Sequence, residues 1–168
     1  MSSDSGSRPR VLSLFSGAGG MDLGFLTAGF DVAFANDVDE NSCQTYRENI
    51  SPDIVCKDVG GLNLDTMPQA DVIIGGPPCQ GFSVAGKMDP EDPRSRLVWQ
   101  FARIVRTKQP RMFVMENVKG LLSARINGKP AITRIVRDLS HPGTAIPGAP
   151  DDLSYKLYSL TEQDMAEG

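Results

Sequence analysis

Histidine, tryptophan and cysteine are scarce in this sequence of 168 residues, and long apolar runs are absent. No stretch approaches the roughly 18–20 apolar residues of a membrane span, which argues against a membrane protein. The three cysteines show no metal-ligand spacing and form no even set, so we expect no metal site and a reduced, cytoplasmic chain. The single His141 lies among prolines and glycines, which favours a solvated or structural role over catalysis.

The first ten residues form a segment of their own. Residues 1–10 are polar, rich in serine and lack the apolar core of a signal peptide. We therefore expect a disordered leader, followed by one domain over residues 11–168.

Acidic residues outnumber basic ones by 21 to 17, a net charge of −4 that at first argues against a nucleic-acid partner. The charge is uneven, because residues 87–137 hold 12 basic and 4 acidic residues, whereas residues 1–86 hold 4 basic and 11 acidic ones. Such a basic block can carry phosphate contacts within an acidic protein. The alternative is that it forms solvated helix faces.

Short apolar segments alternate with segments of helical periodicity along most of the chain. This order predicts an α/β fold that is Rossmann-like and doubly wound, with a mostly parallel sheet covered on both faces. Ligands in such folds bind beyond the carboxyl ends of the strands. The predicted strands are residues 11–15, 31–35, 54–56, 71–75 and 111–115, with a weaker sixth at 155–160, and the predicted helices are residues 21–28, 41–49, 95–108 and 132–139.

A glycine turn and two aspartates fall at three of these strand ends. Glycines at 17, 19 and 20 allow a tight turn and close backbone approach to a ligand. Asp37 is placed to accept hydrogen bonds from ribose hydroxyls, and Asp58 from an adenine amino group. A dinucleotide is less favoured, because Asp22 stands where G-x-G-x-x-G requires its last glycine. The pattern favours an adenosyl ligand, and the alternative for Asp37 is a helix cap or an exposed turn residue.

A cysteine and a glutamate follow two further strands. Cys79 stands between two prolines and Gln80-Gly81, surroundings typical of a stiff loop rather than a core. A thiolate there would be a strong nucleophile once its site activates it. Glu116 ends an apolar strand, where a carboxyl tends toward a raised pKa and can donate a proton. The alternatives are a structural Cys79 and a Glu116 that only caps the next segment.

Cytosine is a substrate that explains the combination of these two groups. Its carbon 5 is a poor nucleophile, but thiolate addition at carbon 6, with an acid at ring nitrogen 3, makes carbon 5 enamine-like. Carbon 5 can then attack the methyl group of S-adenosylmethionine. A base inside a duplex must be flipped out of the stack to react in this way.

The sequence resembles the cytosine-5 DNA methyltransferase family from about Arg10 to Leu160. The matching segments are Phe15–Gly20, Asn36–Asp39, Asp58-Val59, Gly76–Ser83, Asp92–Arg94 with Leu97, and Glu116–Val118. The pair of Pro-Cys and Glu-Asn-Val, about 37 residues apart, is highly specific.

The resemblance implies S-adenosylmethionine as cofactor, double-stranded DNA as partner, and a cytoplasmic, nucleoid-associated location in a prokaryote. It implies Cys79 as nucleophile and Glu116 as the group that holds ring nitrogen 3. Residues 83–96 resemble a loop that closes over the flipped base. The implied cofactor residues are Phe15, Gly17, Ala18, Gly20, Asp37, Val38, Asp58, Val59, Pro78 and Leu97, and those facing DNA are Gln80, Ser83, Arg94, Asn117 and Val118.

The chain departs from the family pattern in two respects. Val38 is smaller than the apolar or aromatic side chain that often packs on adenine in the family. A later arginine motif, a further strand beside the fifth, a target-recognition domain and the last cofactor motif are absent. We expect a split enzyme whose second subunit supplies them, a truncation, or a non-catalytic copy that binds cofactor or partner. A similar scaffold that methylates transfer RNA is the remaining alternative.

Overall fold

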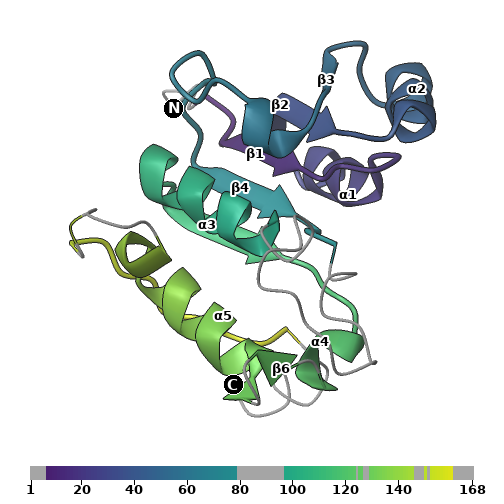
Figure 1. The fold of residues 1–168 in the computed structure, drawn as a ribbon. Coiled ribbons are helices and arrows are strands. Elements are labelled where there is room, and N and C mark those ends of the chain that lie inside the picture. Colours follow the sequence, from purple (N-terminus) through teal and green to yellow (C-terminus); the bar gives the residue numbers. More distant parts are fainter. Residues whose placement is uncertain are drawn as a thin grey trace.

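The computed structural model describes residues 7–78, 97–123, 125–126, 129–145, 150 and 152–160. Its main sheet has five strands, all parallel, in the order β3-β2-β1-β4-β5. This arrangement confirms the Rossmann-like α/β fold (Figure 1). The strands are β1 (Arg10–Leu14), β2 (Asp31–Asp37), β3 (Ile54–Cys56), β4 (Val72–Gly75) and β5 (Met112–Met115).

The sheet has an apolar layer on each face, because successive residues of a strand point to opposite faces. Leu12 and Leu14 of β1 pack with Phe101 of helix α3 on one face. Val11 packs with Phe25 of helix α1 on the other. Helices therefore cover both faces, as Figure 1 shows for α3 in front of the sheet and α1 behind it.

The helices differ in how they are fixed. Helix α3 carries a buried apolar face at helical spacing, with Val98, Phe101, Ile104 and Val105 all at most 2% exposed. Helix α2 begins at an aspartate cap, where the Asp39 carboxylate accepts from the Ser42 N–H. The helices are α1 (Gly20–Thr27), α2 (Glu40–Asn49), α3 (Leu97–Lys108), α4 (Gly120–Ser123) and α5 (Ala131–Ser140), with 3-10 turns η1 (Val59–Gly61) and η4 (Pro142–Ala145).

The weak sixth strand predicted at residues 155–160 is wrong. The alternating pattern does give alternating burial from Tyr155 to Tyr158, but these residues form no strand. Tyr155 instead makes two isolated hydrogen bonds, from its N–H to the Ser140 carbonyl and from its hydroxyl to the Pro110 carbonyl. Pairing with β4 leaves the other edge of β5 without a strand among the described residues. Helix α4 and the hairpin of β6 (Arg125–Ile126) with β7 (Lys129–Pro130) were not predicted.

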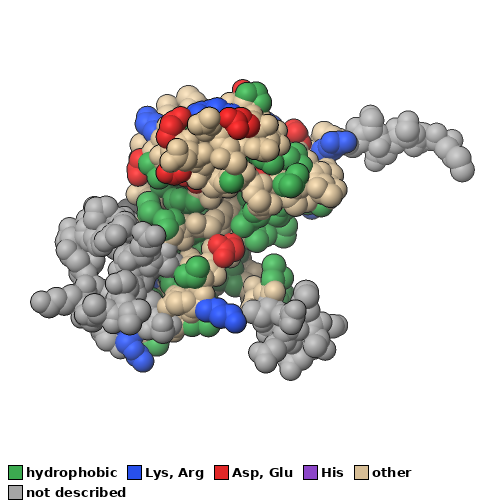
Figure 2. All heavy atoms as spheres, turned by 90° about the vertical axis from the view of Figure 1, so that its right-hand side faces the viewer, with side chains coloured by type: hydrophobic (Ala, Val, Ile, Leu, Met, Phe, Trp, Pro, Cys, Tyr) green, Lys and Arg blue, Asp and Glu red, His purple; other side chains and the backbone are tan. Residues whose placement is uncertain are grey.

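Several basic side chains of residues 87–137 bond to partners within the chain. Lys108 is only 8% exposed, and its ammonium donates to the Met67 carbonyl. Arg106 pairs with Asp152, and Arg134 and Arg137 pair with Asp138. Acidic side chains gather on the upper part of the face shown in Figure 2, around helix α2. The alternative of solvated helix faces is therefore wrong for Lys108 and Arg106, whereas Arg134 and Arg137 are 50% and 64% exposed and fit it; phosphate contacts by the block stay a prediction.

Candidate functional site: a cofactor pocket at the strand ends

The turn after β1 has a backbone that suits glycine. Gly17 and Gly19 have φ of +54° and +92°, a region that other residues rarely adopt. A Cβ at Gly19 would also lie 2.6 Å from Ile50 Cγ1, so the turn packs directly onto the end of α2. Phe15 shares the left-handed conformation, with φ of 54°, which is unusual for an aromatic residue. Such strained backbone is typical of functional sites.

Asp37, the last residue of β2, joins the glycine turn to the second strand. Its Oδ2 accepts from the Gly17 N–H at 2.7 Å, and its Oδ1 accepts from the Asp39 N–H at 2.9 Å. Each carboxylate oxygen has two lone pairs, so both retain capacity for a ligand hydroxyl. Asp39, rather than Asp37, caps helix α2, which makes the helix-cap alternative for Asp37 wrong.

Asp58 stands just after β3 and opens the turn η1. One of its oxygens, Oδ1, accepts from the Gly60 N–H at 2.7 Å. This bond fixes the carboxylate at the rim of the turn, and the next residue, Val59, is only 3% exposed. The local sequence therefore holds an acidic group beside a buried apolar side chain, a combination suited to the edge and face of a base.

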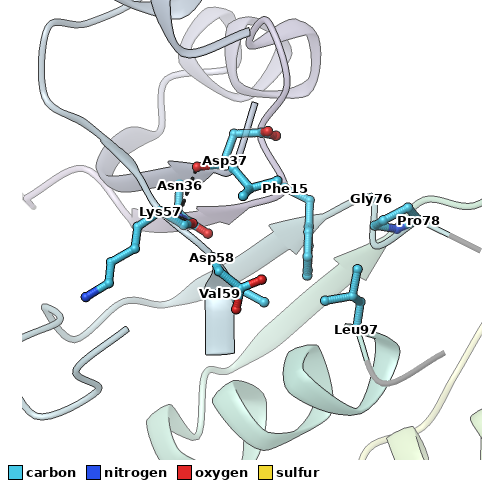
Figure 3. A pocket seen from close by; sticks show the side chains of 10 residues that line it. Phe15, Asn36, Asp37, Lys57, Asp58, Val59, Gly76, Pro78 and Leu97 are labelled. Atoms are coloured by element: carbon cyan, nitrogen blue, oxygen red, sulfur yellow. Dashed lines mark hydrogen bonds between the residues drawn. The ribbon is translucent and has the colours of Figure 1, made fainter. Parts of the chain in front are cut away.

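The three strand ends meet around one pocket of about 220 Å³. In Figure 3 the side chains of Phe15, Val59 and Leu97 face a common space, whereas the Lys57 ammonium points away from it. This volume lies below the roughly 300–1,000 Å³ of typical ligand sites, so the described residues form only part of the wall for a larger ligand. The lining residues are Phe15, Asn36, Asp37, Val38, Lys57, Asp58, Val59, Gly76, Pro78 and Leu97.

Seven of the ten predicted cofactor residues line this pocket, namely Phe15, Asp37, Val38, Asp58, Val59, Pro78 and Leu97. Gly17, Ala18 and Gly20 do not, and lie in the adjoining turn. Sequence reasoning missed Asn36, Lys57 and Gly76 as lining residues. Asn36 and Gly76 lie in segments that match the family motifs, and Lys57 directly precedes Asp58, which were the signals available for them.

A buried network of polar side chains holds the glycine turn against the strands and helices that it joins. Asp22 is fully buried and accepts from the Ser13 hydroxyl at 2.8 Å and from the Tyr46 hydroxyl at 2.7 Å. Burial raises the pKa of the Asp22 carboxyl, and these two hydroxyls oppose the rise. Ser13 Oγ lies 2.9 Å from Ser16 Oγ, within the turn itself. The network joins β1, α1 and α2 beneath the site.

The segments that begin the Pro-Pro-Cys motif and the Glu-Asn-Val motif meet where β4 and β5 end. A Cβ at Gly76 would lie 3.0 Å from Glu116 Oε2, so the Glu116 carboxylate rests against the backbone at the start of the Pro-Pro loop. The Asn117 amide donates to the Pro77 carbonyl at 3.1 Å and ties the two segments together. Glu116 and Val118 are exposed, which leaves both side chains accessible. The substrate roles predicted for Asn117 and Val118 stay predictions.

Four predicted residues lie outside the described part of the chain. They are Cys79, Gln80, Ser83 and Arg94, and residue 78 is the last one described before them. Their roles stay predictions. The described residues hold no group of three or more histidine, cysteine or acidic side chains suited to a metal. Nor does any described helix have the length and apolar character needed to cross a bilayer.

The parallel sheet, the glycine turn and the acidic residues at successive strand ends define a Rossmann-like domain with a pocket at the carboxyl ends of its strands. Residues 9–143 match the profile of the C-5 cytosine-specific DNA methylase family. The chain belongs to that family, which confirms the resemblance drawn from its motifs.

Curated relatives are named as type II methyltransferases. M.NgoFVII of Neisseria gonorrhoeae is 45% identical over 142 residues, which cover 83% of this chain and 37% of that protein. M.FnuDI of Fusobacterium nucleatum is 42% identical over 135 residues, covering 80% and 39%. M.AquIA of a Picosynechococcus strain is 44% identical over 144 residues, covering 79% and 57%. The chain thus spans roughly 40 to 60% of the length of these relatives.

Solved structures agree on the architecture. An Escherichia coli prophage protein, described as a putative DNA modification methyltransferase, matches with a TM-score of 0.62 at 36% identity. The match covers 77% of this chain and 37% of that one. The Dnmt2 methyltransferase of S. pombe matches with a TM-score of 0.61 over 80% of this chain and 41% of its own, but at 23% identity, which shows the fold alone.

Proposed function

We propose that this chain forms the cofactor-binding and catalytic part of an enzyme that transfers a methyl group from S-adenosylmethionine to carbon 5 of cytosine in DNA. One observation carries the proposal: seven residues predicted as cofactor contacts come from separate segments and line a single pocket. The same pocket includes Gly76 and Pro78, the start of the loop that leads to Cys79.

The pocket has the right chemistry for an adenosyl ligand without phosphates. Asp37 and Asp58 place two carboxylates on its wall, and the only lysine of the wall, Lys57, directs its ammonium away from it (Figure 3). Negative potential repels a phosphate and favours the positive sulfonium of S-adenosylmethionine. Phe15, Val59 and Leu97 offer apolar surface to a base, and Asp37 retains acceptor capacity for ribose hydroxyls. When bound, the cofactor supplies an electrophilic methyl group.

The residues of this chain supply the remaining steps. The Cys79 thiolate adds to carbon 6 of cytosine, forming a carbon–sulfur bond while Glu116 donates a proton to ring nitrogen 3. The electron pair released to carbon 5 would take up the methyl group as its bond to sulfur breaks, leaving S-adenosylhomocysteine. A base then removes the proton from carbon 5, the carbon–sulfur bond breaks, and nitrogen 3 returns its proton to Glu116. The contact of Glu116 with Gly76, and of Asn117 with Pro77, supports a short path between the two reacting groups.

Double-stranded DNA is the substrate we propose, with the target base flipped out of the stack. Gln80, Ser83, Arg94, Asn117 and Val118 are the residues we expect to face it. Because the chain spans roughly 40 to 60% of its curated relatives, we propose that protein outside these residues selects the target sequence. A second subunit would be one source of that protein.

The test uses duplex DNA that carries 5-fluorocytosine, incubated with the chain and S-adenosylmethionine. Fluorine cannot leave carbon 5 as a proton, so the enzyme stays covalently attached to the base. We expect an adduct that survives denaturation with the unchanged chain and none with Cys79→Ala. Glu116→Gln should slow adduct formation by about 10²–10⁴-fold, the usual contribution of a positioned acid.

Two further arms separate the alternatives. An adduct formed only after addition of a C-terminal half from a relative such as M.AquIA would point to a split enzyme. Preference for 5-fluorocytosine in transfer RNA would point to RNA methylation. Absence of an adduct in all arms, with S-adenosylmethionine still bound, would leave a cofactor-binding module and contradict the proposed reaction.

A further inference from the structure

Asn36 is a buried amide for which the proposed chemistry has no direct use. It is 1% exposed, although it lies one residue before the end of β2 and beside the pocket. Its Nδ2 donates to the carbonyls of Val55 at 2.9 Å and of Lys57 at 2.7 Å. Backbone carbonyls only accept, so the amide nitrogen must face both of them, and each takes one of its two protons.

These two bonds fix the backbone where β3 ends. Val55 lies within β3, and Lys57 follows its last residue. The Lys57 N–H is itself bonded to the Asp37 carbonyl at 2.8 Å. Both sides of Lys57 are therefore held by β2, and the next peptide unit begins Asp58. The orientation of the Asp58 turn thus depends on the Asn36 side chain.

The backbone of Asn36 holds the glycine turn in the same way. Its N–H donates to the Ser16 hydroxyl at 3.2 Å, and its carbonyl accepts from the Ser16 N–H at 3.0 Å. One buried residue therefore bonds to the turn after β1 through its main chain and to the turn after β3 through its side chain.

We propose that Asn36 is a positioning residue that sets the distance between the glycine turn and the Asp58 carboxylate, and thereby the selectivity of the pocket for adenine. This inference rests on the proposed cofactor. Adenine offers an amino group to a carboxylate, whereas hypoxanthine offers a carbonyl oxygen at the same position. A carboxylate held in place by Asn36 accepts from the first and repels the second.

The test compares two ligands on the full chain by isothermal titration: S-adenosylhomocysteine and its deaminated form, S-inosylhomocysteine. We expect the unchanged chain to prefer the adenine ligand by at least about 10-fold, since a pocket built for a hydrogen bond rejects the analogue that lacks it. In Asn36→Ala the preference should fall below about 3-fold, mainly through weaker binding of the adenine ligand. Asn36→Ser, which keeps one shorter donor, should give an intermediate ratio.

Two controls separate positioning from stability. Leu139→Ala removes a buried side chain of α5 and should lower the melting temperature without changing the preference between the two ligands. Asn49→Ala removes another amide–carbonyl bond, to Thr45 on exposed α2, and should also leave it unchanged. Equal weakening of the binding of both ligands in Asn36→Ala would overturn this inference but not the proposed cofactor. Absence of S-adenosylhomocysteine binding by the unchanged chain would overturn the proposed cofactor, and this inference with it.

Discussion

The two halves of the sheet use their polar side chains in different ways. Around β1, β2 and β3, polar groups such as Asn36 and Asp37 bond to the backbone of neighbouring turns and leave an open pocket between them. Around α3 and α5, the buried Asp138 carboxylate accepts from the Trp99 indole of α3 and from the neighbouring Arg137, and so joins the two helices. The first half carries the pocket that we propose binds the cofactor, whereas the second uses its charge for cohesion.

A charge count along the sequence does not tell which charges are free to bind a ligand. Within the basic block, Lys108 donates to a carbonyl and Arg106 is paired with Asp152, whereas phosphate contacts by the other basic residues stay a prediction. The acidic half carries the pocket because carboxylates there stand at strand ends.

Loss of the thiol should separate chemistry from cofactor binding. We expect Cys79→Ala to reduce methyl transfer by at least about 10³-fold, as removal of a nucleophile does elsewhere. The dissociation constant for S-adenosylmethionine should change by less than about 3-fold, because the pocket is built on other segments. Incorporation of labelled methyl groups and equilibrium dialysis measure the two quantities. Equal loss of both would mean that the cysteine is structural.

Gly75→Ala should damage the contact between the two halves. A Cβ there would lie 2.5 Å from the Leu14 carbonyl oxygen on β1 and 3.1 Å from the Phe101 ring on α3. Backbone has to shift, so we expect the free energy of unfolding to fall by about 3 kcal/mol. Urea denaturation followed by circular dichroism measures the change. The matched Gly24→Ala, with open space around its helical position, should instead stabilise by about 0.5–1 kcal/mol.

Asp138→Asn should weaken the second half alone. Burial by itself raises the pKa of Asp138, but bonds from Trp99 and Arg137 outweigh it and hold the pKa below the ordinary value. A lowered pKa contributes stability above about pH 4 and loses it as the pH falls further. We expect the variant to lose about 2 kcal/mol at pH 7 with unchanged cofactor affinity.

The control for that experiment is Asp152→Asn, which weakens the ion pair with Arg106; because Asp152 itself is 63% exposed, the change should cost about 1 kcal/mol, less than Asp138→Asn. A change in cofactor affinity in Asp138→Asn would contradict the division between the two halves.

Tyr46→Phe should have a modest effect on the stability of the first half. Burial and the bond to Asp22 raise the pKa of the Tyr46 phenol above its ordinary value of about 10. The protonated phenol therefore stabilises the fold below pH 10, and this contribution is lost as the pH rises beyond it. We expect a loss of about 1 kcal/mol at pH 7 and a smaller decline of stability between pH 10 and 11 than in the unchanged chain. Parallel alkaline slopes in thermal melts of the two proteins would argue against this.

The sequence predicted the fold well because its strands are short apolar runs between clear helical patterns. Seven of the residues that the family resemblance implied as cofactor contacts line one pocket, and strand-end reasoning alone had pointed to Asp37 and Asp58 among them. The role of Asn36 could not be predicted, because nothing in the sequence pattern shows that its amide reaches the carbonyls of Val55 in β3 and of Lys57 just after it. The segment after Tyr155 alternates like a strand, but alternation reports one-sided burial and not a backbone partner.

The most direct test of the central claim is a backbone-amide NMR titration of the chain with S-adenosylhomocysteine. The amides of Gly17, Asp37 and Asp58, one at each of three strand ends, should shift together and saturate at one ligand per chain. Amides of α5, in the half that uses its charge for cohesion, should stay unchanged. Shifts centred on α5, or none at the three strand ends, would contradict the account.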